Sequence, residues 1–204
     1  ISAGPAAWRI FLFNIFDHAP QLIKDFTWPE HLMKGYVKKY PMLFTGGQTS
    51  ITHMHFDIDV SHILHTQFMG KKRVLLFPNK EQHKLYRKPF EVLSMVDFSN
   101  YYDAENSKVD YDKFPALKEA NGYEVILDHG DTLFMPAGFW HHMEYLESGF
   151  AMSLRALQPT IVGKLNGVWN LFGMRSIDTV MKKILPHPWY NWKQRKIAAN
   201  ADKI

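Results

Sequence analysis

The chain has 204 residues, with 24 Lys and Arg against 20 Asp and Glu, a hydrophobic fraction of 46% and no cysteine. This length suffices for one sizeable domain with its own core, and without cysteine there is neither a disulfide framework nor a thiolate nucleophile. Lys and Arg clusters are short and scattered, no apolar run reaches membrane-spanning length and no signal peptide is visible. We therefore expect a cytoplasmic protein that binds neither nucleic acid nor membrane. The chain begins without methionine, and we expect some upstream residues of the domain to be missing.

The first 40 residues predict one strand and two helices. Residues 9–14 are almost all apolar or aromatic, which is typical of a buried strand. Residues 17–25 have a helical pattern with a proline near its start. A second helix is expected over residues 28–40, because Pro29 suits a first helical position.

Two strands are expected next, over residues 41–45 and 50–57, with the Gly46-Gly47 turn between them. The second carries His55 and Asp57 two residues apart. Residues two apart in a strand point to the same face. An imidazole and a carboxylate can therefore reach one point.

The following segment predicts a hairpin. Residues 62–68 form its first strand, with His65 and Gln67 on one face, and residues 74–77 form its second. The turn between them is Gly-Lys-Lys-Arg at residues 70–73. Residues 78–92 predict irregular structure with one helical turn.

A long surface loop is expected over residues 97–114, which are rich in Asp, Asn, Ser and Tyr. Loops of this length in compact domains often bind ligands. We expect this loop to lie at the mouth of the domain. Its candidates for substrate contact are Tyr101, Tyr102 and Tyr111.

Four more strand patterns follow, at residues 123–127, 132–135, 139–143 and 150–157, separated by glycine and proline turns. The third holds His141 and His142. Neighbouring residues of a strand point to opposite faces, so only one of these imidazoles can join His55.

Residues 162–184 have a helical apolar pattern, and a break near residue 173 predicts two helices. Pro186 ends them, and a Lys-rich polar tail is expected after it. We expect a barrel domain over residues 1–160 and a helical extension over residues 161–204. The apolar face of the extension either packs on the barrel or forms a homodimer interface.

Two histidines and one carboxylate on one face of a metal form the facial triad of non-haem Fe(II) oxygenases. His55, Asp57 and His141 or His142 supply this set. The other positions on the metal stay open for O2 and a co-substrate. His-x-Asp alone is a weak signal, because a histidine is often a surface or hydrogen-bonded core residue. Asp59 and His53 remain rival ligands.

Four segments of the chain stand out together: THMHFD at residues 52–57, QFMGKKRVLLFP at residues 67–78, GYEV at residues 122–125 and GDTLFMPAGFWHHME at residues 130–144. In this order they resemble the JmjC-type, or cupin-like, 2-oxoglutarate oxygenases, and within them the subgroup of the asparaginyl hydroxylase that inhibits the hypoxia-inducible factor and its bacterial relatives. The resemblance covers about residues 40 to 157.

The resemblance implies a role for several further residues. It selects His141, which follows a tryptophan as in the relatives, over His142. Thr52 would hydrogen-bond a carboxylate of 2-oxoglutarate, Lys72 would pair with its distal carboxylate, and His65 would line the co-substrate pocket. Arg155 competes with Lys72 for the distal carboxylate, or else pairs with a carboxylate of the chain itself.

One departure from the family pattern lies between the His-x-Asp motif and Gly70, where this chain has two additional residues. An ungapped alignment would move the motif's histidine onto Asp57 and its aspartate onto Asp59. That shift would leave only one imidazole in the segment. We therefore favour His55 and Asp57, with a small insertion in the following turn.

The expected fold is mainly β, a double-stranded β-helix of the jelly-roll or cupin kind with helices at both ends. The expected function is hydroxylation of a protein or peptide side chain, or of a small molecule, by an oxygenase that uses Fe(II) and 2-oxoglutarate and releases succinate and CO2. Demethylation is less favoured, because no aromatic cage for methyl-lysine is evident. The alternative is a metal-binding cupin without oxygenase activity, acting in binding or interaction.

Overall fold

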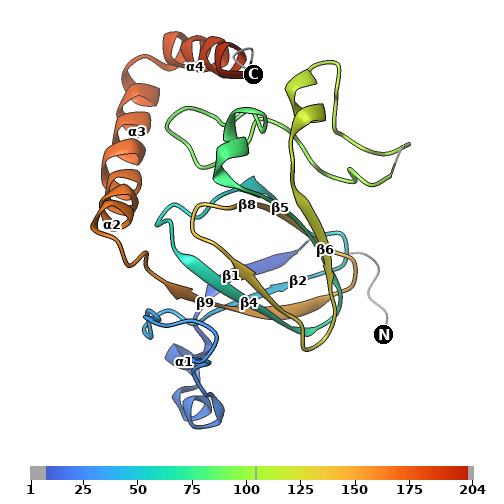
Figure 1. The fold of residues 1–204 in the computed structure, drawn as a ribbon, viewed down its shortest axis with the longest axis vertical. Coiled ribbons are helices and arrows are strands. Elements are labelled where there is room, and N and C mark those ends of the chain that lie inside the picture. The colour runs from blue at the N-terminus through green and yellow to red at the C-terminus, as the bar shows by residue number, and fades with distance from the viewer. Residues whose placement is uncertain (1–7, 104, 202–204) are drawn as a thin grey trace.

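The computed structural model describes residues 8–103 and 105–201. Two antiparallel sheets form a barrel, with short helical turns near the N-terminus and longer helices at the C-terminus (Figure 1). The strand order is β1-β2-β9-β4-β7 in the larger sheet and β3-β8-β5-β6 in the smaller one. The predicted double-stranded β-helix is confirmed.

The strands are β1 (Arg9–Phe13), β2 (Met42–Gly46), β3 (Ile51–His55), β4 (His62–Met69), β5 (Lys72–Phe77), β6 (Tyr123–Leu127), β7 (Thr132–Met135), β8 (Trp140–Tyr145) and β9 (Gly149–Ala156). The α-helices are α1 (Ile15–His18), α2 (Ile161–Val168), α3 (Arg175–Ile184) and α4 (Pro186–Ala201). Turns of 3-10 helix cover Pro20–Asp25, Asn79–His83 and Pro115–Glu119.

The register of β5 against β8 separates the two faces of the smaller sheet. Lys72 lies opposite Tyr145 and Leu76 opposite His141, so these four side chains share the inner face of the barrel. The apolar part of the interior is formed by Ile63, Val74, Leu76, Leu127, Met135 and Met143.

The outer face of the same sheet carries a second and larger core. It joins strand residues to the segment between β5 and β6 and to α4. Its buried members are Met54, Phe56, Leu75, Phe77, Leu85, Tyr86, Val96, Phe98, Phe114, Leu117, Trp140, Ile197 and Ala201. The predicted loop at residues 97–114 therefore covers the outer face rather than the mouth of the barrel.

The N-terminal segment differs from its prediction. β1 forms where a strand is expected, but it lies at the edge of the larger sheet and its Phe11 is 57% exposed. The helix predicted over residues 28–40 is wrong. Gly35 has a φ of +76°, and Tyr36 pairs instead with Ala156 of β9. A left-handed glycine and a backbone pairing to a distant strand are both incompatible with a continuous helix.

The predicted helix at residues 17–25 is present but divided. It consists of the single turn α1 followed by the 3-10 turn Pro20–Asp25. Pro20 has no backbone N–H to continue an α-helix, which accounts for the interruption between the two turns.

The C-terminal helices also correct the prediction. The expected break near residue 173 is a π-helical stretch, Trp169–Met174, that leads without interruption from α2 into α3. The polar tail expected after Pro186 is instead the 16-residue helix α4. In Figure 1, α2 and α3 lie end to end beside the barrel and α4 lies across its upper end.

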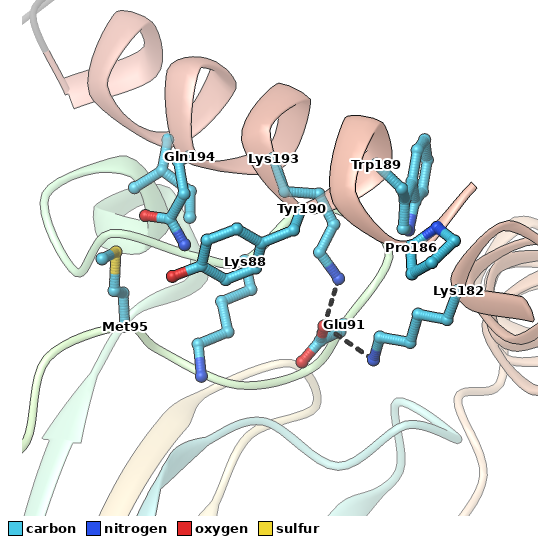
Figure 2. A pocket seen from close by; sticks show the side chains of 10 residues that line it. Lys88, Glu91, Met95, Lys182, Pro186, Trp189, Tyr190, Lys193 and Gln194 are labelled. Atoms are coloured by element: carbon cyan, nitrogen blue, oxygen red, sulfur yellow. Dashed lines mark hydrogen bonds and ion pairs between the residues drawn. The ribbon is translucent and has the colours of Figure 1, made fainter.

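Ion pairs attach α4 to the rest of the protein (Figure 2). Lys193 is 5% exposed and donates hydrogen bonds to Glu91 and to Asp178, 2.8 Å away in α3. Glu91 also pairs with Lys182 at 3.2 Å. A cavity of about 420 Å³ lies between α4 and the Lys88–Met95 segment, and none of the predicted site residues lines it.

The side of α2 and α3 that faces solvent is strongly apolar. Ile161 is 77% exposed and Phe172 is 69% exposed. The exposed apolar side chains of these helices and the π-helical turn are Ile161, Val162, Leu165, Val168, Trp169, Phe172, Ile177, Val180 and Ile184. These side chains are therefore not buried against the barrel.

One residue of α2 does approach the barrel closely. Gly167 is buried, and a Cβ atom added there would lie 2.6 Å from the backbone oxygen of Asp59. Any larger residue would push the helix away from the turn that follows β3. No helix within the described residues is both long and apolar enough to cross a membrane.

Candidate metal centre

His55, Asp57 and His141 converge at one end of the barrel. His55 ends β3 and pairs with His141 of β8, and their ring centroids are 4.2 Å apart. Asp57 follows in the turn after β3. One ligand atom from each of the three side chains lies within 4.8 Å of the other two. This arrangement matches the predicted triad in residue type and in proximity.

A β-bulge in β3 sets the direction of these side chains. Thr52 pairs with Met143 and His55 pairs with His141, so three residues of β3 span only two of β8. Met143 and His141 share the inner face, and the extra residue therefore turns Thr52 and His55 to that face together. Without the bulge, residues three apart would point to opposite faces.

The protonation state of both imidazoles suits metal binding. Nδ1 of His55 lies 2.8 Å from the carbonyl oxygen of His53, and Nδ1 of His141 lies 3.3 Å from that of Phe139. A carbonyl only accepts, so Nδ1 carries the proton in each ring and Nε2 keeps its lone pair. Burial lowers the pKa of His55, and it lowers that of His141 to about 3.

The Asp57 carboxylate is held by Arg155 of β9. The Arg155 Nη2 atom lies 3.0 Å from Oδ1 of Asp57, and Nη1 lies 3.2 Å from Oδ1 of Asp59. Burial alone would raise the pKa of Asp57, but the Arg155 guanidinium and the two histidines lower it below its ordinary value. The carboxylate is thus ionised and available as a ligand.

Lys72 is a buried cation on the same inner face. It is 1% exposed, its Nζ lies 3.1 Å from Nε2 of His65, and it stands 4.3 Å from the centre of the Tyr145 ring. Among the described residues, none of the Asp or Glu side chains forms an ion pair with it. A buried charge without a counter-charge is costly, and a dianionic ligand would supply one.

Burial lowers the pKa of Lys72 to about 7. His65 is kept neutral, because burial and then the Lys72 charge lower its pKa well below the ordinary value. Its Nε2 therefore accepts a hydrogen bond from the lysine, and its Nδ1 donates one to Oγ of Ser153 at 2.8 Å. This chain fixes the position of the lysine nitrogen.

Thr52 is hydrogen-bonded to Arg9 of β1. Its Oγ1 accepts a hydrogen bond of 2.7 Å from Arg9, which also donates to the backbone oxygen of Ile51. Arg9 thus adds a cation to Lys72 and Arg155 in this part of the barrel, and no sequence pattern indicated that it would contact Thr52.

The rival ligands lie elsewhere. His53 is exposed, and Asp59 is engaged by Arg155. His142 points to the outer face beside Phe98, with ring centroids 6.0 Å apart, and neither of its ring nitrogens has a hydrogen-bond partner within residues 8–103 and 105–201. The selection of His55, Asp57 and His141 agrees with these positions, although their role as metal ligands remains a prediction.

Two inner-face residues were missed in the sequence. Tyr145 and Ser153 contact the Lys72–His65 pair. The alternation of β8 would have found Tyr145, because it follows His141 by four residues and therefore shares its face. Ser153 likewise precedes Arg155 by two residues on β9.

With this geometry in view, the comparisons with known proteins define the class. A family model described as a cupin-like domain matches residues 12–159. The chain belongs to this family, which includes the JmjC-domain proteins among its relatives.

Several curated proteins are similar to the chain. It is 29% identical over 168 residues to JmjC domain-containing protein F of Dictyostelium discoideum, covering 69% of this chain and 33% of that protein. It is 27% identical over 143 residues to lysine-specific demethylase 8 of Xenopus tropicalis, covering 69% and 31%. It is 30% identical over 141 residues to arginine-specific demethylase JMJ20 of Arabidopsis thaliana, covering 69% and 28%. The matched part of the chain thus corresponds to about a third of each relative.

Proposed function

We propose that this protein is an Fe(II)- and 2-oxoglutarate-dependent oxygenase that hydroxylates a protein or peptide side chain, with succinate and CO2 as co-products. One observation carries the proposal. Two neutral imidazoles and an ionised carboxylate converge at one end of the barrel, and Lys72, a buried lysine with no acidic partner in the described part of the chain, lies on the same inner face. Membership of the cupin-like family supports the class of reaction.

His55, Asp57 and His141 would hold Fe(II), because their donor set is that of the facial triad. Lys72 would pair with the distal carboxylate of 2-oxoglutarate, and Thr52 would donate a hydrogen bond to the same co-substrate. When bound, the metal and 2-oxoglutarate supply the oxidising chemistry with O2.

The chain contributes position and a water-poor interior. His65 and Ser153 hold the Lys72 nitrogen in one place, so a carboxylate meets a fixed cation. Arg155 is already bound to Asp57 and Asp59, which favours Lys72 over Arg155 as the partner of the distal carboxylate.

Removal of an N-methyl group is a second candidate reaction, favoured by the names of two relatives that are demethylases of lysine or arginine. It begins from the same oxidation of a C–H bond. Product analysis separates the two reactions, since demethylation releases formaldehyde while hydroxylation leaves one additional oxygen atom on the substrate.

The test is an anaerobic Fe(II) titration with and without 2-oxoglutarate, followed by visible absorption. We expect a weak metal-to-ligand charge-transfer band that requires both ligands, that disappears in Lys72→Ala, and that Asp57→Ala abolishes together with metal binding. If metal binds and no band forms, the protein is a metal-binding cupin without oxygenase activity. Normal turnover by Asp57→Ala would instead indicate Asp59 as the ligand.

We further propose that a second copy of this chain covers the apolar side of α2 and α3. The exposed fractions of Ile161 and Phe172 support an interface rather than packing on the barrel. A closed two-fold arrangement would bury this patch on both chains at once. Sedimentation of the full chain tests the proposal, and a monomer at all concentrations would contradict it.

A further inference from the structure

The position of Arg155 poses an electrostatic problem for the proposed metal site. Its guanidinium lies 3.0 Å from Oδ1 of Asp57, one of the three ligand residues. A fixed positive charge at that distance orients the carboxylate but also repels a divalent cation. A metal site built in this way needs a compensating negative charge close to the guanidinium.

Asp59 is placed where it provides that charge. Both of its carboxylate oxygens accept hydrogen bonds from Nη1 of Arg155, at 3.2 and 3.3 Å. Burial by itself would lower the pKa of Arg155, but Asp57 and Asp59 raise it, so the guanidinium keeps its charge. The side chains of Arg155, Asp57 and Asp59 are only 15%, 17% and 24% exposed, which limits screening by solvent.

The turn that carries Asp59 is held from several directions. Ser61 Oγ donates a hydrogen bond of 2.7 Å to Asp59 Oδ2. Val60 adopts a φ of 53°, which a β-branched residue rarely adopts. Gly167 of α2 packs against the backbone of Asp59. The carboxylate of Asp59 is therefore fixed on Arg155 rather than turned toward the histidines.

We propose that Asp59 is a positioning residue that balances the charge of Arg155, so that the guanidinium orients Asp57 without opposing the metal ion. This inference rests on the proposed metal site. Asp57, Asp59 and Arg155 together carry a net charge of −1, whereas Asp57 and Arg155 alone would be neutral.

The experiment titrates Co(II) alone into the metal-free 204-residue chain and measures the dissociation constant from visible absorption. We expect Asp59→Asn to weaken Co(II) binding at least tenfold, in the range found for residues that support metal ligands. The double variant D59N/R155M removes the Arg155 guanidinium together with the Asp59 carboxylate. It should bind Co(II) within about threefold of the unmodified protein, a recovery that loss of a merely structural contact would not give.

Two controls accompany these variants. Asp112→Asn makes the same change of charge on an exposed loop and should leave binding unchanged. Asp57→Ala should bind no Co(II). If Asp59→Asn unfolds without metal, the double variant alone decides the question, because it leaves no buried guanidinium unpaired.

Each outcome supports or overturns a distinct statement. Unchanged Co(II) affinity in Asp59→Asn refutes the role of Asp59 and leaves the metal site standing. Equal weakening in Asp59→Asn and in the double variant also refutes it, because removal of the guanidinium then restores no affinity. If the unmodified protein binds no Co(II), or binds it as well as Asp57→Ala does, the proposed metal site itself is wrong.

Discussion

Replacing Lys72 with methionine should stabilise the metal-free protein and at the same time abolish binding of 2-oxoglutarate. The lysine is 1% exposed and its pKa is lowered from 10.5 to about 7 by burial. At 1.36 kcal/mol per pKa unit, keeping the side chain charged costs the folded protein roughly 5 kcal/mol. Methionine has nearly the same length and carries no charge.

Part of this gain is offset. The variant loses the hydrogen bond to His65 and the contact between the ammonium group and the Tyr145 ring. These losses cost about 1 to 3 kcal/mol in total. We therefore expect Lys72→Met to be more stable than the unmodified protein by about 2 kcal/mol or more near pH 6.

The advantage of the variant should depend on pH in a defined direction. Below about pH 7 the lysine is charged in both the folded and the unfolded chain, and the penalty is present in full. Between about 7 and 10.5 the folded protein loses the proton first, so the penalty declines, and above 10.5 it vanishes. The stability difference between the two proteins should accordingly shrink from pH 6 to pH 9.

Urea unfolding of both metal-free proteins at the two pH values measures this difference. Lys71→Met is the matched control, since Lys71 has a 38% exposed side chain paired with exposed Asp128 and should change stability by no more than about 0.5 kcal/mol. A Lys72→Met protein that is less stable at pH 6, or whose advantage does not decline with pH, would refute the view of Lys72 as a charged and uncompensated group.

Three further predictions concern the site and the helices. His141→Leu should abolish Fe(II) binding, whereas His142→Leu should retain it and lose no stability, because neither His142 nitrogen has a hydrogen-bond partner among the described residues. Isothermal titration measures Fe(II) binding and urea unfolding measures stability, and equal loss of metal binding in the two variants would contradict the assignment of faces. The affinity for 2-oxoglutarate should be constant below about pH 7 and fall tenfold per unit above it, because only charged Lys72 pairs with the dianion; a flat profile up to pH 9 would exclude this pairing. Phe172→Asp should give a monomer by sedimentation while Lys164→Asp should not, and a dimer that persists in Phe172→Asp would place the interface elsewhere.

The strands could be predicted because they follow from local pattern, whereas the choice of His141 over His142 rested on the family resemblance, and Asp57 lies beyond the end of β3 rather than within a strand. Side chains alternate between the two faces of each strand, so the pattern around His141 predicts that His141 and His142 point to opposite faces. The predicted strands at residues 123–127 and 132–135 coincide with β6 and β7. Even so, the bulge that brings Thr52 to the face of His55 has no local sequence signal.

The remaining features depend on contacts between distant residues. Arg155 reaches Asp59 across 96 positions of the chain, so no spacing rule shows that the two side chains meet. The residues after Pro186 look like a polar tail, but Lys193 is buried against Asp178 and Glu91. The helix expected after Pro29 is lost because pairing of Tyr36 with Ala156 outweighs local propensity.

The contact between Gly167 and Asp59 bears on where this protein can be shortened. A boundary at residue 160 looks natural, since β9 ends at Ala156 and the family match ends at residue 159. A chain cut there would lose the helix that lies against the turn of Asp59, and water would reach a backbone that is covered in the intact protein. Trimmed versions made for crystallisation or for binding assays should therefore retain α2, because its two turns help to hold in place the turn beside the proposed metal ligands.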